Sequence, residues 1–406
     1  MLGALLALCL LALCLGAPVR YLLSKDWPKI RNALFFPLAG KARFQHHAQR
    51  NRLLKKFNAT QLQIQTGDNR TIHALWAQPT NNQTKQSNTH ARQSPALIAD
   101  QGQEHTLDTL SSISACHQAQ SGNSGGDANK YDPPTALLFH ANAMVLDDMV
   151  EWMEFYMHCG FSVLSVTFGG YPDPSEEPCT SLTANDDVFD DVSSPRYPNE
   201  SSIYLDAEAA LTYLRKVKQS PIDRILVHGL SIGGAAACAL GSRHSGLRVT
   251  LDQTFTSMVD VATHVGAGLY EQIVLQHVPL WSHRYLRALS PCILWLASRI
   301  LVRMSFINKT FPNFDNCCTL DGFDNVRKAT RIQGNLFVIY STHDEMMPIS
   351  FARRLLVARY GNDGSDDLLN SRSLCVPGGH CSFFGHEPEL VAIYQDYLKE
   401  QGLIHL

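Results

Sequence analysis

The stretch Gly229-Leu230-Ser231-Ile232-Gly233-Gly234 decides the fold. The apolar run 225–227 before it is typical of a buried strand, and the small residues 235–240 after it are typical of a helix. Gly-x-Ser-x-Gly between a strand and a helix predicts a nucleophile elbow, in which the serine lies on a sharp, strained turn. Glycines suit this turn because a strand and a helix pack closely there. The new helix also directs free N–H groups toward the serine.

Composition sets the broad class of the chain. Its 406 residues, 45% of them hydrophobic, suffice for a large folded core. A net charge of −3 and no long basic stripe give no reason to expect a nucleic-acid partner. The 11 cysteines have no repeated spacing, which favours free thiols over a disulfide framework or a Cys-x-x-Cys metal pair. The Asn-x-Ser/Thr sites have meaning only in a glycosylating compartment.

The N-terminus is predicted to be a membrane anchor over residues 1–23. Residues 1–19 are almost entirely apolar and uncharged, and basic residues dominate the segment that follows. Positive-inside logic then predicts a single N-terminal span with the catalytic domain in the cytoplasm, and residues 24–58 as a juxtamembrane segment. The alternative is a secretory signal and a secreted protein, although this segment has no basic start and only poor cleavage sites.

Residues 59–402 are predicted to form one α/β domain. A hairpin is expected over 61–76, and apolar runs then alternate with amphipathic segments up to the last predicted helix, 387–398. Such alternation predicts a mostly parallel sheet with helices on both faces. Two segments interrupt it: the polar stretch 79–133, which predicts a flexible insertion, and the apolar stretch 256–330, which predicts a helical cap over the substrate pocket.

A serine hydroxyl needs a positioned base, and the best candidate is His380. It follows the last predicted strand in a Gly-Gly-His loop. Asp344 directly follows the apolar strand 335–340, at the edge where sites form in open α/β sheets. We therefore expect Ser231 as nucleophile, His380 as base and Asp344 as the group that orients the base.

Other assignments of these roles stay open. Asp252 and Asp260 are rivals to Asp344 for the acid, with Glu345 a lesser one. His228 is interpreted as a core residue and His343 as a structural one. Cys375, His380 and Cys381, with Cys317-Cys318, could be drawn as a metal site, but the spacing is irregular and the triad makes better use of the same histidine. No metal and no cofactor are therefore expected.

The oxyanion of the reaction needs two hydrogen-bond donors. The backbone N–H of Ile232, next to the nucleophile, is the first candidate. The second is expected after the strand 135–139, where Asn142 is preferred and Ala141 is the alternative.

Four pieces of the chain resemble the α/β-hydrolase superfamily. They are Phe139-His140-Ala141-Asn142-Ala143, Gly169-Gly170-Tyr171, the elbow at 229–234, and His343-Asp344-Glu345 with Gly379-His380. Ala141 stands where the family usually has glycine. The resemblance covers roughly residues 60–402 and is nearest to serine hydrolases with a His-Gly-Asn-Ala loop, several of which are membrane-tethered esterases or depalmitoylating thioesterases. It implies an eight-stranded sheet, the triad above and a cap.

The residues and the resemblance together predict a membrane-tethered serine hydrolase acting on a carboxylic ester or thioester through an acyl-enzyme. A lipid ester or an S-acylated protein is the favoured substrate, on the strength of the anchor and the apolar cap. One alternative is a peptidase of the same fold. Another is a membrane-anchored binding protein that has lost activity.

Overall fold

The fold is described from a computed structural model. It describes residue 51, residues 54–79, 133–142, 144–171, 198–269, parts of 283–296, 322–361 and 367–404. The predicted anchor at 1–23, most of the segment 24–58, nearly all of the insertion 79–133 and most of the predicted cap lie outside these residues.

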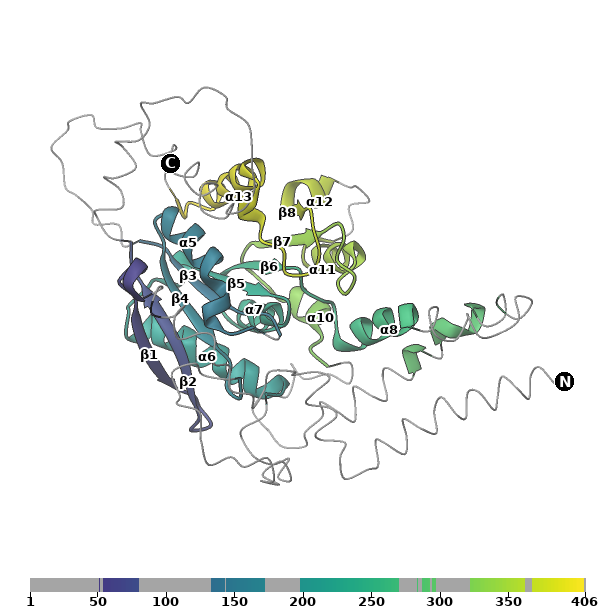
Figure 1. Ribbon diagram of the computed structural model, residues 1–406, viewed down its shortest axis with the longest axis horizontal. Coiled ribbons are helices and arrows are strands. Elements are labelled where there is room, and N and C mark those ends of the chain that lie inside the picture. Colours follow the sequence, from purple (N-terminus) through teal and green to yellow (C-terminus); the bar gives the residue numbers. More distant parts are fainter. Residues whose placement is uncertain are drawn as a thin grey trace, which may run out of the picture.

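One sheet of eight strands organises the described residues, in the order β1-β2-β4-β3-β5-β6-β7-β8 (Figure 1). The hairpin of the first two strands is antiparallel and joins β4 in antiparallel pairing, and the remaining neighbours are parallel. This arrangement is the α/β-hydrolase fold, so the predicted fold class is confirmed. The strands are β1 (Thr60–Gln65), β2 (Thr71–Ala77), β3 (Thr135–Phe139), β4 (Ser162–Thr167), β5 (Ile225–Leu230), β6 (Arg248–Asp252), β7 (Leu336–Ser341) and β8 (Ser373–Val376).

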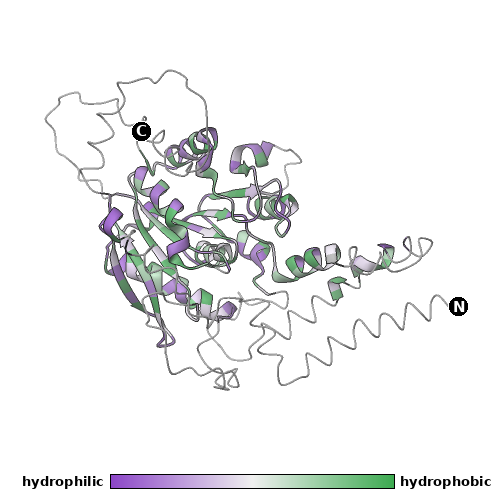
Figure 2. Cartoon of the chain, viewed as in Figure 1, coloured by the Kyte–Doolittle hydropathy of each residue, from purple (hydrophilic) through white to green (hydrophobic). Residues whose placement is uncertain are grey.

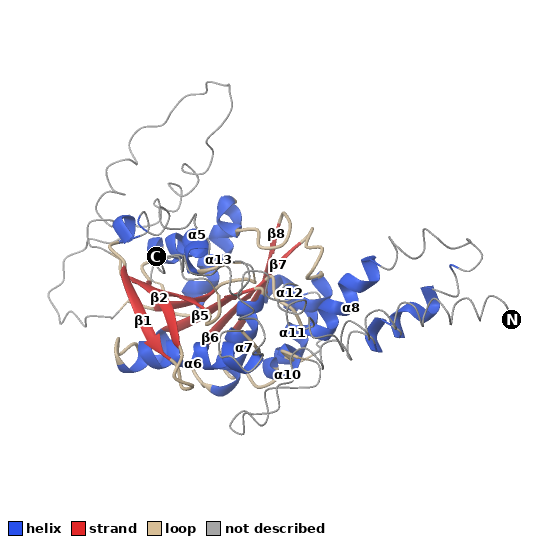
Figure 3. Cartoon of the chain, turned by 60° about the horizontal axis from the view of Figure 1, so that its bottom comes forward, coloured by secondary structure: helices blue, strands red, loops and turns tan. Residues whose placement is uncertain are grey.

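Helices cover both faces of the sheet, as Figure 3 shows with the strands in red between blue helices. Hydrophobic cores lie on both sides, and alternate residues of a strand enter different cores: in β5, Ile225 and Val227 face one and Leu226 the other. Both faces are buried, so the central strands read as continuous apolar runs, green in Figure 2.

The helices divide between the two cores. Residues of α6 (Glu200–Lys216), α7 (Ile232–Arg243), α10 (Asn325–Ala329), α11 (Ile349–Tyr360) and α12 (Asp367–Arg372) enter one core. Residues of α5 (Val150–His158) and α13 (Pro388–Glu400) enter the other. Helix α8 (Met258–Leu269), at the start of the predicted cap, extends away from the sheet (Figure 1).

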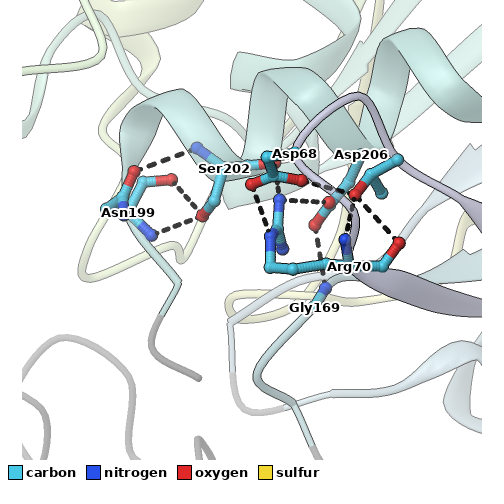
Figure 4. A network of polar contacts seen from close by, with 7 residues as sticks. Asp68, Arg70, Gly169, Asn199, Ser202 and Asp206 are labelled. Atoms are coloured by element: carbon cyan, nitrogen blue, oxygen red, sulfur yellow. Dashed lines mark hydrogen bonds and ion pairs between the residues drawn. The ribbon is translucent and has the colours of Figure 1, made fainter. Parts of the chain in front are cut away.

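A buried polar network fastens the β1–β2 turn to α6 (Figure 4). Arg70 pairs with the fully buried carboxylate of Asp206 at 2.8 Å and with Asp68 at 2.7 Å. Asp206 also accepts a hydrogen bond from the backbone N–H of Gly169, at 2.8 Å. The same helix begins at a cap in which the Asn199 side chain accepts from the backbone N–H of Ser202. Three segments distant in sequence are thus held together beside β4.

The prediction of an N-terminal membrane span is contradicted. Within the residues that the structure describes, none of the helices has both the length and the apolar character that crossing a bilayer requires. The longest of them, α6, has 17 residues. At about 1.5 Å per residue it falls short of a hydrocarbon core about 30 Å thick, and it carries charged side chains. The predicted localisation, a single N-terminal span with a cytoplasmic catalytic domain, depended on this anchor and is contradicted as well. Residues 1–23 themselves lie outside the described part.

Candidate active site

Ser231 occupies a strained turn between β5 and α7. Its backbone has φ 52° and ψ −112°, a left-handed conformation that a residue with a side chain rarely adopts. The backbone is held on both sides, because Ser231 N–H donates to Asp252 O at 2.8 Å and Thr254 Oγ1 donates to Ser231 O at 2.6 Å. Strain of this kind persists only where the surroundings fix it, and it concentrates at functional sites.

Steric exclusion by neighbouring backbone atoms requires glycine at two positions of the elbow. A Cβ on Gly229 would lie 2.2 Å from the carbonyl oxygen of Gly233, and one on Gly233 would lie 2.3 Å from that of Phe139. Both obstacles are backbone atoms that cannot turn aside. Close approach of strand, turn and helix therefore excludes larger residues at both positions.

The structure brings His380 to Ser231. In the loop after β8, His380 Nε2 lies 3.0 Å from Ser231 Oγ, and His380 Nδ1 lies 2.7 Å from Asp344 Oδ2. With its proton on Nδ1, the imidazole donates to the carboxylate and leaves Nε2 free to accept from the hydroxyl. This is the geometry that lets an imidazole take the hydroxyl proton as the serine attacks.

Asp344 is fixed by its own loop. Its side chain is fully buried, and Oδ1 accepts hydrogen bonds from the backbone N–H groups of Met346 at 2.9 Å and Met347 at 2.8 Å. One oxygen thus holds the loop while the other faces His380. Burial lowers the pKa of the His380 imidazole, but its hydrogen bond to Asp344 and its interactions with Cys381 raise it more, so the net shift is upward.

The rival acids lie elsewhere. Asp252 is fully buried, and its Oδ2 faces His228 Nε2 at 3.1 Å and accepts from Trp152 Nε1 at 3.0 Å. Asp260 faces Thr256 and Arg354. Glu345 is exposed. Among the described carboxylates, Asp344 is therefore the one hydrogen-bonded to His380.

Ile232 and Asn142 are the predicted oxyanion donors: Ile232 lies within the elbow, directly after Ser231, and Asn142 lies in the loop after β3. Ile232 is the first residue of α7, where helix geometry gives its N–H no acceptor within the helix. Asn142 follows β3, whose last residue Phe139 pairs with Gly229 of β5. The role of these two N–H groups as oxyanion donors stays a prediction.

Two aromatic residues order the loop that carries Asn142. Tyr171 OH donates to Asn142 Oδ1 at 2.8 Å. His140 is fully buried; its Nε2 accepts from the backbone N–H of Phe168 at 3.1 Å, while Nδ1 lies 2.8 Å from Ala141 O. Burial lowers the pKa of His140 to about 4, so its ring stays neutral and serves as a structural bridge.

Two residues of the site were not anticipated. Gln253 hydrogen-bonds the backbone of Ser382, just after His380, and Thr254 hydrogen-bonds that of Ser231. Both directly follow β6, at the edge of the sheet where the triad residues were expected. Their position after an apolar strand, at this edge of the sheet, is the sequence signal that could have identified them as site residues.

No model of a known protein family matches the chain. A stretch of 131 residues is 29% identical to the protein Bem46 of Schizosaccharomyces pombe, which is 32% of this chain and 37% of that protein. The chain thus spans just over a third of this relative.

Solved structures give weaker likenesses. An esterase of Pyrococcus furiosus has a TM-score of 0.45 at 13% identity, with 86% of this chain and 95% of that one covered. An acylaminoacyl peptidase of Pyrococcus horikoshii has a TM-score of 0.45 at 11% identity, with 87% and 43% covered. The strand order and the site geometry, described above, define the fold independently of these likenesses.

Proposed function

We propose that this chain is a serine hydrolase that cleaves a carboxylic ester or thioester through an acyl-enzyme. The observation that carries the proposal is the 3.0 Å contact between Ser231 Oγ and His380 Nε2 on a strained elbow, with Asp344 behind the imidazole. A neutral base within hydrogen-bond reach of a serine, itself oriented by a buried carboxylate, is the arrangement that makes a hydroxyl nucleophilic.

The reaction follows from these positions. Ser231 Oγ attacks the carbonyl carbon while His380 Nε2 takes the hydroxyl proton, and Asp344 stabilises the resulting imidazolium without accepting a proton. The tetrahedral intermediate expels the alcohol or thiol, which receives the proton from His380. A water molecule, deprotonated by the same imidazole, then attacks the acyl-enzyme, and His380 returns this proton to Ser231 Oγ as the acid is released. No cofactor is needed for either half.

The developing negative charge is assigned to two backbone donors. In this proposal the N–H groups of Ile232, at the start of α7, and Asn142, after β3, donate to the carbonyl oxygen as it becomes an oxyanion. Donors that are fixed before the reaction need no rearrangement when the charge appears. The hydrogen bond from Tyr171 to Asn142 helps to keep the second donor in place.

The proposed substrate is an acyl ester or thioester without a defined chain length. A preference for lipid esters or S-acylated proteins depended on the membrane anchor, which is contradicted, and on the cap, most of which lies outside the described residues. The proposal therefore rests on the acyl-transfer chemistry of the site alone.

A fluorophosphonate probe tests this proposal. We expect labelling of the wild-type protein that Ser231→Ala abolishes. Ser242→Ala removes a serine at the far end of the same helix, whose hydroxyl donates to Ala239 O, and should label as the wild type does. Turnover is then measured on matched p-nitrophenyl esters, acyl thioesters and peptide amides. Folded wild-type protein that does not label overturns the proposal, and turnover of peptides alone overturns its ester and thioester part.

A further inference from the structure

We propose that Gln253 is a positioning residue for His380, and that the segment 252–254 sets the distance between base and nucleophile. This inference rests on the proposed hydrolase function. It concerns a residue outside the triad and the oxyanion loop, located directly after β6.

Gln253 holds the histidine loop at two points. Its Nε2 donates to Ser382 O at 2.8 Å, and its Oε1 accepts from the Ser382 backbone N–H at 3.2 Å. The side-chain amide thus pairs with the backbone of Ser382 as a neighbouring strand would. Ser382 comes two residues after His380, and Cys381 between them has φ 65°, so the chain turns sharply at this place. Fixing both polar atoms of Ser382 limits how far the imidazole can shift.

Gln253 itself is fixed from the other side. It is 1% exposed, and its backbone N–H donates to Ile339 O at 2.7 Å. Its Nε2 also donates to Asp252 Oδ1 at 3.1 Å, so both amide hydrogens and the amide oxygen have partners. The other oxygen of Asp252 is held by Trp152 and His228. The amide therefore has one satisfied orientation, which is the condition for a precise side-chain clamp.

The neighbours of Gln253 hold the nucleophile. Asp252 O accepts from the Ser231 N–H at 2.8 Å, and Thr254 Oγ1 donates to Ser231 O at 2.6 Å. Three consecutive residues therefore bind the backbone of the nucleophile and the loop of the base at once. The contact between Ser231 and His380 joins residues 149 apart in sequence, and this segment is the short structural link between them.

The backbone conformation of Gln253 supports a role for this residue in the site. It has φ 45°, a left-handed conformation that is unfavourable for a residue with a long side chain. Glycine or asparagine would adopt this conformation more readily. The strain is compensated by the contacts of the amide, and such compensation is typical of residues that serve a site.

The test is Gln253→Met, which keeps the length and bulk of the side chain but removes the amide. We expect kcat to fall about 10- to 100-fold with KM changed less than about twofold, because a misplaced base slows the chemical step more than it weakens binding. Gln395→Met is the matched control. It replaces another buried glutamine, on α13, whose amide contacts Cys159 at 3.6 Å, and it should leave kcat unchanged.

A double-mutant cycle separates positioning from general stability. In a His380→Ala background, Gln253→Met should have no further effect on the residual turnover of an activated ester, because its target is gone. Gln253→Asn, which tolerates the left-handed backbone but falls one methylene short of Ser382, covers the case in which the methionine variant does not fold, and it should also lower kcat.

The outcomes are distinguishable. Wild-type protein without labelling or turnover removes the proposed function itself. An active wild type whose kcat is unchanged by loss of the Gln253 amide overturns the positioning role alone. So does an equal loss of activity with and without His380.

Discussion

The elbow that carries Ser231 and the loop that carries His380 meet at one site but are fixed by different means. The elbow is shaped by space: backbone atoms of Gly233 and Phe139 lie where side chains on Gly229 and Gly233 would be. The histidine loop is held by hydrogen bonds: the carboxylate of Asp344 accepts one from His380, and the amide of Gln253 bonds the backbone of Ser382. Gly229 and Gly233 lie four residues apart, although Phe139, the obstacle at Gly233, comes from β3. The loop and Gln253 are 129 residues apart.

This difference separates what a short motif can encode from what only the fold can supply. Steric exclusion at the turn is recorded as glycine in the local sequence, whether the obstacle comes from the elbow itself or, as with Phe139, from β3. A hydrogen bond across the sheet edge depends on the order and register of β6, β7 and β8. The elbow should therefore fail through loss of stability when it is altered, and the histidine loop through loss of chemistry while the protein remains folded.

The largest expected effect is at Asp344. Asp344→Asn keeps the shape of the side chain but favours the wrong tautomer of His380, and we expect kcat to fall by about 10⁴-fold. Glu345→Gln neutralises the adjacent, exposed carboxylate and should leave kcat unchanged. Steady-state kinetics on the ester found active in the labelling experiment measures both. Equal effects of the two variants would assign the role of Asp344 to nonspecific charge rather than to the contact with His380.

A glycine pair tests the steric half of the comparison. Gly229→Ala places a methyl group against the Gly233 carbonyl, and we expect a loss of about 1–3 kcal/mol in the free energy of unfolding, as for other overpacked sites. Gly379→Ala, in the histidine loop, meets nothing within 4 Å and should be close to neutral. Urea unfolding followed by circular dichroism compares them. A neutral Gly229→Ala would show that the elbow relaxes, against the steric account.

The same distinction explains what the sequence could predict. The hairpin, the parallel strands and the approach of Ser231, Asp344 and His380 follow from apolar periodicity and from strand ends meeting at one edge. The role of Gln253 was not predicted, because it depends on an amide that reaches Ser382 across strands, and no local sequence pattern records such a contact. The membrane span was inferred from the apolar run 1–19 and the basic residues after it, which are properties of composition along the chain and do not by themselves establish a spanning helix.

The smallest expected effect is a shift along the pH axis. His380 must be neutral to accept the serine proton, and its interactions with Asp344 and Cys381 raise its pKa despite burial. The acid limb of kcat/KM should therefore lie above about 6.5, the ordinary histidine value, with activity still rising above neutral pH. The same shift in the pKa of His380 makes the folding stability depend on pH in the opposite direction from the activity. A raised pKa means that folding favours the protonated ring, so the contribution is complete below about 6.5 and is lost as pH rises through the folded value. Profiles of kcat/KM and of urea midpoint measure the two. In Asp344→Asn the acid limb should move down, whereas Glu345→Gln should leave it in place. A wild-type limb at or below 6.5 would contradict the contact between His380 and Asp344 as the source of the shift.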